Sequence, residues 1–461
     1  MRVRASQILK ARKIWLLPVA IAAVFVALMS AIYIGSVVDP TAHLHELPVM
    51  VVNQDTGATV QGQRVDIGTS LVSALEGSSA VTDRLRLRTV TMQRAKATMN
   101  RGGAYATLVI PATLSQSVLV AAGQSRTNGV PAKATVELLE NQRLGSLGTG
   151  LAAGVLTPAI AQISPQIGTK VAKLATPAAA GNPVAAATLA DPIAMTSTQF
   201  EPLPAHSALG LSAFYVALLA IMGGFVGATL INSSIDSALG YGATELGPHW
   251  RQRRPVAINR RQTLLVKWAA ATVAAPVLTG VLMVIAITAL HMYAPDWLLL
   301  WGLCAFASLM IAFGTLTLLA IVGSLGQLLA MILLVYLSLA SSGGTVPIQA
   351  LPGFFQAFAH VEPLRQVLGG TRAVMYFGAQ GDAGLTHSLI MIACELAFWA
   401  LLGLVVTRFY DRRGLYRLTP DLWAFINHTI DQRVADVQAG DRAAAAPSGH
   451  VVGADVGSAA S

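Results

Sequence analysis

The chain has 461 residues, of which 54% are hydrophobic and only 11% are charged, and its mean hydropathy is +0.60. Soluble domains carry about 25% charged residues, so this composition excludes an ordinary soluble protein and predicts an integral membrane protein. The formal net charge of +9 then indicates basic cytoplasmic loops and not nucleic-acid binding. Cys304 and Cys394 both lie within apolar runs, so we expect no structural disulfide.

The first predicted element is a membrane-spanning helix. The basic stretch "MRVRASQILKARK" precedes an apolar run over 14–38, which is about 25 residues long. The apolar core of a cleaved signal peptide is shorter, at about 7–15 residues, and no clear cleavage motif follows. We therefore predict that residues 1–38 form a cytoplasmic N-terminus and an uncleaved first transmembrane helix.

Residues 39–207 have a different character. The strand-like pieces "LPVMVVNQ", "AYATLVIP" and "KATVELLE" alternate with "IGTSLVSALEG" and "LSQSVLVAAG", whose apolar spacing is typical of helices with one buried face. The later part is rich in Ala, Gly, Thr and Pro, with a helical half followed by a loose connector at 175–191. We predict an α/β extracytoplasmic domain with a helical and linker part, inserted between helices one and two.

Five further apolar runs follow, at 208–231, 268–290, 297–322, 325–340 and 389–406. Four of them are long enough to cross about 30 Å of hydrocarbon as helices, whereas the run at 325–340 is short. The predicted fold class is therefore an α-helical integral membrane protein with six transmembrane helices. Five of these helices form a permease-like domain at 208–410.

The basic residues decide the predicted orientation. The loop at 232–267 contains Arg251, Arg253, Arg254, Arg260, Arg261 and Lys267, and four more arginines follow the last helix in "RFYDRRGLYR". Because loops rich in Lys and Arg remain in the cytoplasm, both regions and both termini are predicted to be cytoplasmic. Residues 39–207 and 341–388 then lie outside. The cytoplasmic tail at 411–461 ends in an Ala-, Gly- and Ser-rich stretch that we expect to be partly disordered.

The short fifth helix ends at "SSGGTVPIQALPGFFQAF". An unwound backbone cannot be left bare in lipid, so this segment must lie at the interface or be covered by protein. We predict a re-entrant or interfacial pair of helices on the outer side, which closes an outer gate; the alternative is an ordinary exported loop with aromatic anchors. The predicted gate residues are Gly343, Gly344, Pro347, Pro352, Phe354, Phe355, Pro363 and Arg372.

Two smaller features have open alternatives. Asn53, Asp55 and Gly57 are typical of a tight turn after a strand, and the rest of a calcium-loop signature is missing. Glu395 lies about seven residues into the last apolar run, where a carboxylate is costly; it is either paired within the structure or carries protons. We find no metal, cofactor or catalytic motif, so we expect no enzyme activity.

Several stretches resemble one family, the type-two ABC exporter permeases, and most closely their phage-infection-protein (YhgE/Pip) branch. The resemblance rests on "LPVMVVNQDTGATVQGQRVDIGTSLVSAL", "AYATLVIPATLSQSVL", "VELLENQR", "HSALGLSAFYVALLAIMGGFVGATL" and the outer segment with its Gly-Gly-x-x-Pro and Leu-Pro. Together these stretches extend over residues 14–410. One departure is "EPLRQV", where the branch commonly has Pro followed by Thr-Tyr.

The resemblance implies an export permease in a bacterial cytoplasmic membrane, either a homodimer or part of a hetero-oligomer. The sequence has no phosphate-binding loop, so ATP-driven transport needs a separate ATPase subunit. The residues that we expect to contact this ATPase are Glu245, Arg251, Arg253, Arg254, Arg260 and Arg261. Alternatively, these arginines only set the topology and contact anionic lipid. The expected substrates are hydrophobic or amphipathic.

Two other functions remain open at this point. One alternative is an envelope scaffold or receptor that does not transport, such as a phage receptor or a secretion-system accessory. The other is a proton-coupled drug exporter that depends on Glu395.

Overall fold

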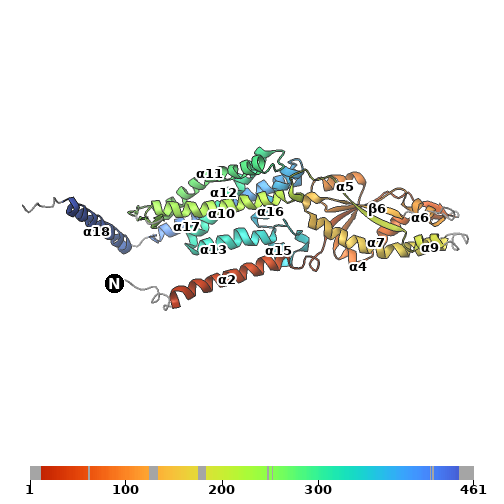
Figure 1. Cartoon of the computed structure of the whole chain (residues 1–461), viewed down its shortest axis with the longest axis horizontal. Helices are drawn as coiled ribbons and strands as arrows, with labels where there is room; N and C mark the ends of the chain where they lie inside the picture. The colour runs from red at the N-terminus through yellow and green to blue at the C-terminus, as the bar shows by residue number, and fades with distance from the viewer. Residues whose placement is uncertain are drawn as a thin grey trace, which may run out of the picture.

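The computed structural model describes residues 12–60, 63–123, 133–174, 183–246, 249–251, 253–415, 417 and 420–445. The molecule is elongated, with an α/β unit at one end, long helices in the middle and helix α18 (Pro420–Ala445) at the other end (Figure 1). The Ala-, Gly- and Ser-rich stretch that the sequence predicts to be partly disordered begins within α18, at residues 439–445, and its remainder lies outside the described residues. Most of the basic stretch before the first helix also lies outside them.

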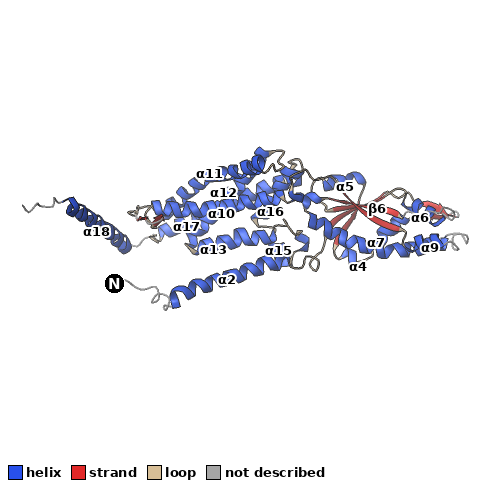
Figure 2. Cartoon of the chain, in the orientation of Figure 1, coloured by secondary structure: helices blue, strands red, loops and turns tan. Residues whose placement is uncertain are grey.

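The α/β unit is built on a five-stranded sheet in the order β4-β1-β5-β6-β7. Strands β5 and β6 are antiparallel, and the other neighbours are parallel. Figure 2 shows the strands gathered at this end of the molecule, apart from a short hairpin at the far end. The bounds are β1 Leu47–Asn53, β4 Leu85–Thr89, β5 Ala106–Ile110, β6 Ala134–Glu140 and β7 Ile193–Gln199, with a separate hairpin of β2 Ala58–Val60 and β3 Gln63–Val65.

Strand β1 is buried on both faces, and its alternate residues pack into two different cores. Leu47, Val49 and Val51 belong to the larger core, and Met50 and Val52 to the smaller one. This division follows from the two-residue period of a strand. Helices α3, α6, α7 and α9 contribute to the larger core and α5 to the smaller one. Their bounds, with the short α4, are α3 Ile67–Glu76, α4 Ser79–Thr82, α5 Met92–Met99, α6 Leu114–Gly123, α7 Ser146–Leu174 and α9 Pro183–Ala190.

Within the described parts of the chain, six helices are long and apolar enough to cross a membrane, a finding that fits a multi-pass membrane protein. The number agrees with the prediction, but the membership differs. Helix α7, which was not predicted as a span, meets the criteria of length and composition, although it packs against the sheet. The predicted fifth span, Leu325–Ser341, is a shorter apolar helix and does not meet them. The remaining five are α2 Arg12–Val37, α10 Ser212–Ala238, α11 Arg260–Val284 continued by the π-helical η3 Ile285–Ala289, α12 Trp297–Val322 and α17 Leu385–Arg412.

The segment Leu325–Ser341 consists of α13 (Leu325–Ala330), the π-helical η4 (Met331–Tyr336) and α14 (Leu337–Ser341). Helix α2 packs against this segment. The rings of Phe25 and Tyr336 meet edge to face, with 6.2 Å between their centres. Most of α2 is otherwise exposed within the chain. An apolar helix with so little protein contact is typical of a lipid-facing position.

The helices α10, α11 and α17 pack around α12, and α16, which lies near the α/β unit, packs against α10, α12 and α17 (Figure 1). Gly224 of α10 is in close contact with α12, since a Cβ built there would lie 2.4 Å from the Ser308 carbonyl oxygen. Small residues at such crossings let two helix backbones approach. The shorter elements here are η1 Gln142–Leu144, η2 Ala208–Gly210, η5 Ile348–Ala350, α15 Gly353–Phe358, α16 Pro363–Tyr376 and η6 Gly381–Ala383.

Candidate functional sites at the two ends of the helix bundle

The predicted gate segment lies where the helix bundle meets the α/β unit; we call this region the junction. Gly343 has a φ of +69°, and a Cβ on Gly344 would lie 2.1 Å from the Phe214 ring of α10. The helix therefore ends here because the backbone turns through a left-handed conformation and then presses on an aromatic ring. The next residues are mostly buried, so the segment is a packed element and not an exposed loop.

The rest of the segment packs into the core of the sheet. Val346, Leu351 and Phe355 belong to the same hydrophobic cluster as β1 and α7, and the His45 amide donates to the Gln349 carbonyl at 3.0 Å. Pro347 is buried, Pro352 precedes α15 and Pro363 is the first residue of α16, where its missing N–H costs nothing. Phe354 is 65% exposed, and its ring lies edge-on to that of Phe355, with 5.3 Å between the ring centres.

Arg372 of α16 contacts the unwound backbone directly. Its Nη2 donates to the carbonyl oxygens of Gly343 and Gly344, each at 3.4 Å. Its buried Nε has no partner among the described residues. Of the predicted gate residues, the structure thus brings Gly343, Gly344 and Arg372 together.

Arg143, which the sequence analysis did not single out, connects the two halves of the molecule. It donates from Nη2 to Asn100 Oδ1 at 2.9 Å, and from Nη1 to Glu201 Oε2 at 2.8 Å and to the Tyr376 carbonyl at 3.2 Å. Its guanidinium also lies 5.1 Å from the centre of the Phe377 ring. Burial lowers the pKa of Arg143, and the nearby Glu201 carboxylate opposes this effect. The only signal in the sequence is its position directly after the strand "VELLENQ".

Two carboxyl groups lie near each other beside α16. Glu362 is fully buried and caps α16, accepting from the amides of Leu364 at 2.8 Å and Arg365 at 2.6 Å. Glu395 of α17 is close enough to interact with it electrostatically, and its buried Oε1 has no partner within the described parts of the chain. The sequence singled out Glu395 alone; a Glu directly before a Pro is the signal for the cap.

Asn53, Asp55 and Gly57 form a turn at the end of β1. The Asp55 amide donates to Asn53 Oδ1 at 3.0 Å, and Gly57 has a φ of +71°. The Asp55 carboxylate also accepts from the amides of Gly68 at 2.8 Å and Ser115 at 3.1 Å. These donors occupy the carboxylate oxygens that a metal ion would need. The hydrogen bonds instead fix the conformation of the turn.

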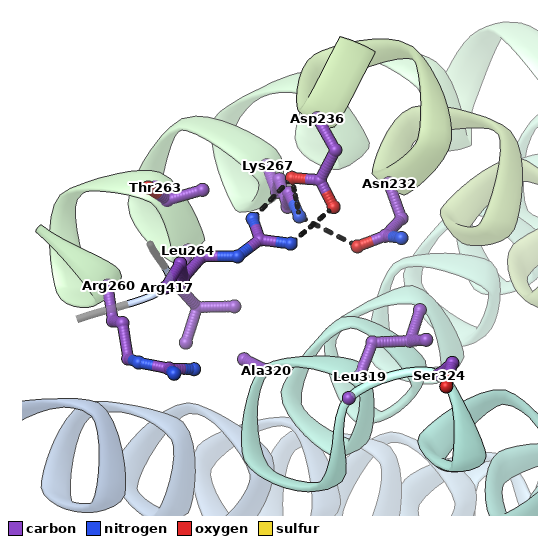
Figure 3. A pocket seen from close by; sticks show the side chains of 11 residues that line it. Asn232, Asp236, Arg260, Thr263, Leu264, Lys267, Leu319, Ala320, Ser324 and Arg417 are labelled. Carbon is purple, nitrogen blue, oxygen red and sulfur yellow. Dashed lines mark hydrogen bonds and ion pairs between the residues drawn. The ribbon is translucent and has the colours of Figure 1, made fainter. Parts of the chain in front are cut away.

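The opposite end of the bundle, which we call the distal end, carries a cluster of charges (Figure 3). Asp236 of α10 accepts from Arg417 Nη1 at 2.5 Å and Nη2 at 2.8 Å and pairs with Lys267 Nζ of α11 at 2.7 Å. Asn232 Oδ1 accepts a further bond from Lys267 at 2.7 Å. Lys267 is only 5% exposed, so it depends on these partners. The hydrogen bonds to Asp236 raise the pKa of Arg417.

The predicted ATPase-contacting residues lie at this distal end. Arg253 and Arg254 are exposed, and Arg254 pairs with Asp431 of α18. Arg260 and Arg261 begin α11, and their amides donate to Asp411 of α17 at 2.9 and 3.1 Å. The backbones of Glu245 and Arg251 belong to the hairpin of β8 (Thr244–Leu246) and β9 (His249–Arg251); the side chains of these two residues lie outside the described part.

A cavity of about 220 Å³ opens beside the charge cluster (Figure 3). Its lining combines the charged side chains with apolar ones, Leu264 of α11 and Leu319 and Ala320 of α12. Asp236, Lys267, Asp411 and Arg417 were not predicted as site residues, because their partners lie far away in the sequence. The site therefore joins the ends of α10, α11 and α17 to the segment after α17.

Comparison with known proteins identifies the family. The profile of a family described as "Protein of unknown function (DUF3533)" matches residues 18–394. The uncharacterized protein YhgE of Bacillus subtilis (strain 168) is 38% identical over 90 residues, which are 18% of this chain and 11% of that protein. The chain thus matches about one tenth of the length of this relative, and the match confirms the resemblance to the YhgE/Pip branch.

Among solved structures, a domain assigned to an ABC type-2 transporter of Thermotoga maritima MSB8 is similar to part of this chain. The similarity covers 34% of this chain and 89% of that domain, with 21% sequence identity and a TM-score of 0.23.

Proposed function

This chain belongs to the family described as protein of unknown function DUF3533, and from that membership we propose that it is the permease subunit of an exporter that a separate ATPase drives. Its substrates would be hydrophobic or amphipathic molecules. The chain itself would carry out no catalysis, and it would act in a bacterial cytoplasmic membrane as a homodimer or in a hetero-oligomer. The motifs of the YhgE/Pip branch and the six long apolar helices support this proposal.

The charged surface at the distal end is the observation that carries the proposal. A motor subunit must contact several transmembrane helices if it is to move them together. Here one carboxylate, Asp236, holds Lys267 of α11 and Arg417 after α17, and Asp411 holds the start of α11. A force applied to the ends of α10 and α11, which the segment carrying the β8–β9 hairpin connects, would therefore be shared among α10, α11 and α17 through bonded contacts.

The opposite end supports the outer part of the mechanism. In the proposed orientation the distal end faces the cytoplasm, and the α/β unit is an extracytoplasmic domain inserted between helices one and two. The unwound Gly343–Gly344 backbone, held by Arg372, would form the outer gate. Because the gate segment shares a core with the sheet, movement of the helices would also move the α/β unit.

The test is affinity purification of the intact protein from mild detergent, followed by mass spectrometry of the proteins that co-purify. We expect an ABC-type ATPase in near-stoichiometric amounts, which is lost in Arg253→Glu. Arg253 is suitable because it is exposed and forms no ion pair within the described residues, so its reversal should leave the fold intact. The matched control is Lys96→Glu on the exposed surface of α5 in the α/β unit.

Recovery of envelope or secretion components without an ATPase would contradict the permease function and favour a scaffold or receptor. If an ATPase co-purifies and remains bound in Arg253→Glu, the permease function stands, but the ATPase contacts another surface.

Proton-coupled export is a second candidate, and the proximity of Glu362 and the unpartnered Glu395 oxygen favours it. Purified protein in vesicles should then carry protons down an imposed pH gradient, measured with an enclosed pH-sensitive dye. The flux should vanish in Glu395→Gln and persist in Glu76→Gln, which changes an exposed carboxylate of α3 in the α/β unit. Equal flux in protein-free vesicles would remove this candidate.

A further inference from the structure

The cavity at the distal end has an excess of positive charge. Its lining includes three cationic side chains, Arg260, Lys267 and Arg417, and one carboxylate, Asp236, which leaves two positive charges uncompensated within the lining. Cations gathered around a cavity at the end of a helix bundle attract an anion, and basic pockets between membrane helices are known sites for acidic lipid headgroups.

Arg260 is the least compensated of these cations. Its Nε donates to the Leu415 carbonyl at 2.6 Å and its guanidinium lies 5.3 Å from the centre of the Tyr410 ring, but it forms no ion pair among the described residues. The nearby Asp411 carboxylate accepts from the amides of Arg260 and Arg261 instead. Arg260 also lies close enough to Arg417 for the two guanidinium groups to repel each other. An anion between them would remove this repulsion.

The cavity also has apolar lining, which favours an amphipathic occupant. Leu264 lies between Arg260 and Lys267 on α11, and Leu319 and Ala320 line the cavity from α12; Val322 and Leu325, which flank the lining residues Gly323 and Ser324 in the sequence, are 45% and 59% exposed. The cavity of about 220 Å³ is much larger than the share of one water molecule, which is about 30 Å³ in the liquid. An anion with an attached hydrocarbon part can contact both the cationic and the apolar side chains, whereas a free ion is attracted only by the cationic ones.

We propose that this cavity binds an anionic phosphate group, with the headgroup of an acidic membrane phospholipid as its source. The phosphate contacts Arg260 and the outer side of the cluster that Arg417 and Lys267 form with Asp236, and the glycerol and upper acyl chain lie along Leu264, Leu319 and Ala320. The inference rests on the proposed function in one respect only, the orientation that places this end in the cytoplasmic leaflet, where acidic lipids are abundant.

The experiment measures the thermal stability of the full-length protein in a neutral detergent. Phosphatidylglycerol, phosphatidylcholine or inorganic phosphate is added at equal phosphate concentration to wild-type protein, Arg260→Gln and Arg413→Gln. Arg413→Gln is the matched control, since Arg413 is an exposed arginine at the same end that does not line the cavity. Ala320→Leu serves as a second variant, because it narrows the cavity and leaves every charge in place.

We expect phosphatidylglycerol to raise the melting temperature of wild type and Arg413→Gln, with no rise from phosphatidylcholine or inorganic phosphate. The lipid concentration for half of the effect should rise about fivefold in Arg260→Gln, since one basic residue contributes about 1 kcal/mol to acidic lipid binding. Ala320→Leu should also weaken the response. An equal rise with inorganic phosphate would support the phosphate site and overturn the lipid source.

The proposal is overturned if none of the three additives stabilises wild type, or if Arg260→Gln and Ala320→Leu both respond as Arg413→Gln does. None of these measurements involves an ATPase, so they do not depend on whether a motor subunit binds.

Discussion

Single residues at the junction hold together parts of the chain that are far apart in the sequence. Arg143 bonds to Asn100, Glu201 and the backbone of Tyr376, which lies 233 residues away. A sequence shows an arginine after a strand and gives no indication of these partners. For the same reason the buried cap Glu362 and the pair Asp236–Lys267 could not be found from spacing, whereas Glu395 could, because a carboxyl within an apolar run is unusual by itself.

Arg143→Met should lower the free energy of unfolding by roughly 2–3 kcal/mol, because it leaves the buried Tyr376 carbonyl and the half-buried Asn100 side-chain oxygen without this donor. Thermal denaturation followed by circular dichroism measures the effect. Arg64→Met is the control, since Arg64 is exposed and, among the described residues, bonds only to the Thr56 carbonyl. Equal losses in the two variants would contradict the connecting role of Arg143.

Asp191 should give the α/β unit a pH dependence. Hydrogen bonds from Lys133 and Ser164 lower the pKa of Asp191 from its ordinary value of 3.8. Its ionised form therefore stabilises the fold above that value, and the stabilisation is lost as the pH falls through the lower folded-state pKa. Asp191→Asn should cost at most about 1 kcal/mol at pH 7, since the Lys133 pair is exposed, and the cost should shrink towards pH 3. A cost that is constant from pH 7 to pH 3 would disprove this role.

At the scale of elements, continuous apolar runs predicted the long helices and the strands β1 and β5, which are buried on both faces, and an alternating pattern predicted β6, which is buried on one. Strands β4 and β7 were missed: they are edge strands whose exposed residues are polar, such as Arg86 and Arg88. Helix α7 shows the limit of composition, since the same apolar length serves a membrane span or a helix packed on a sheet.

The end of the short fifth helix depends on Gly344. Gly344→Ala should destabilise the junction by about 1–3 kcal/mol, because the new Cβ meets the Phe214 ring and one of the two must move. Gly353→Ala is the matched control, since nothing lies within 4 Å of a Cβ built there. Cysteine labelling at Ser342 measures the effect: the rate should rise in Gly344→Ala and stay at the wild-type value in Gly353→Ala. Equal rates in all three proteins would contradict a packed gate segment.

At the scale of the whole molecule, the two ends of the bundle differ in chemistry. The junction joins an unwound backbone to an α/β unit through shared apolar packing, and the distal end joins several helices through shared carboxylates. The basic loops at 232–267 and after the last helix predicted which end carries the positive charge, and the structure brings both loops to the distal end (Figure 1). The ion pairs between these loops, such as that of Arg417 with Asp236, could not be predicted, because they join residues that are far apart in the sequence.

The central claim is that a motor subunit contacts the distal end. The most direct measurement is photo-crosslinking in intact cells, with a photoreactive amino acid placed at Arg253 and, for comparison, at Lys96 of the α/β unit. The account predicts a crosslink from Arg253 to an ABC-type ATPase and none from Lys96 to that protein. A crosslink to the ATPase from Lys96, or only envelope proteins captured at both positions, would contradict it.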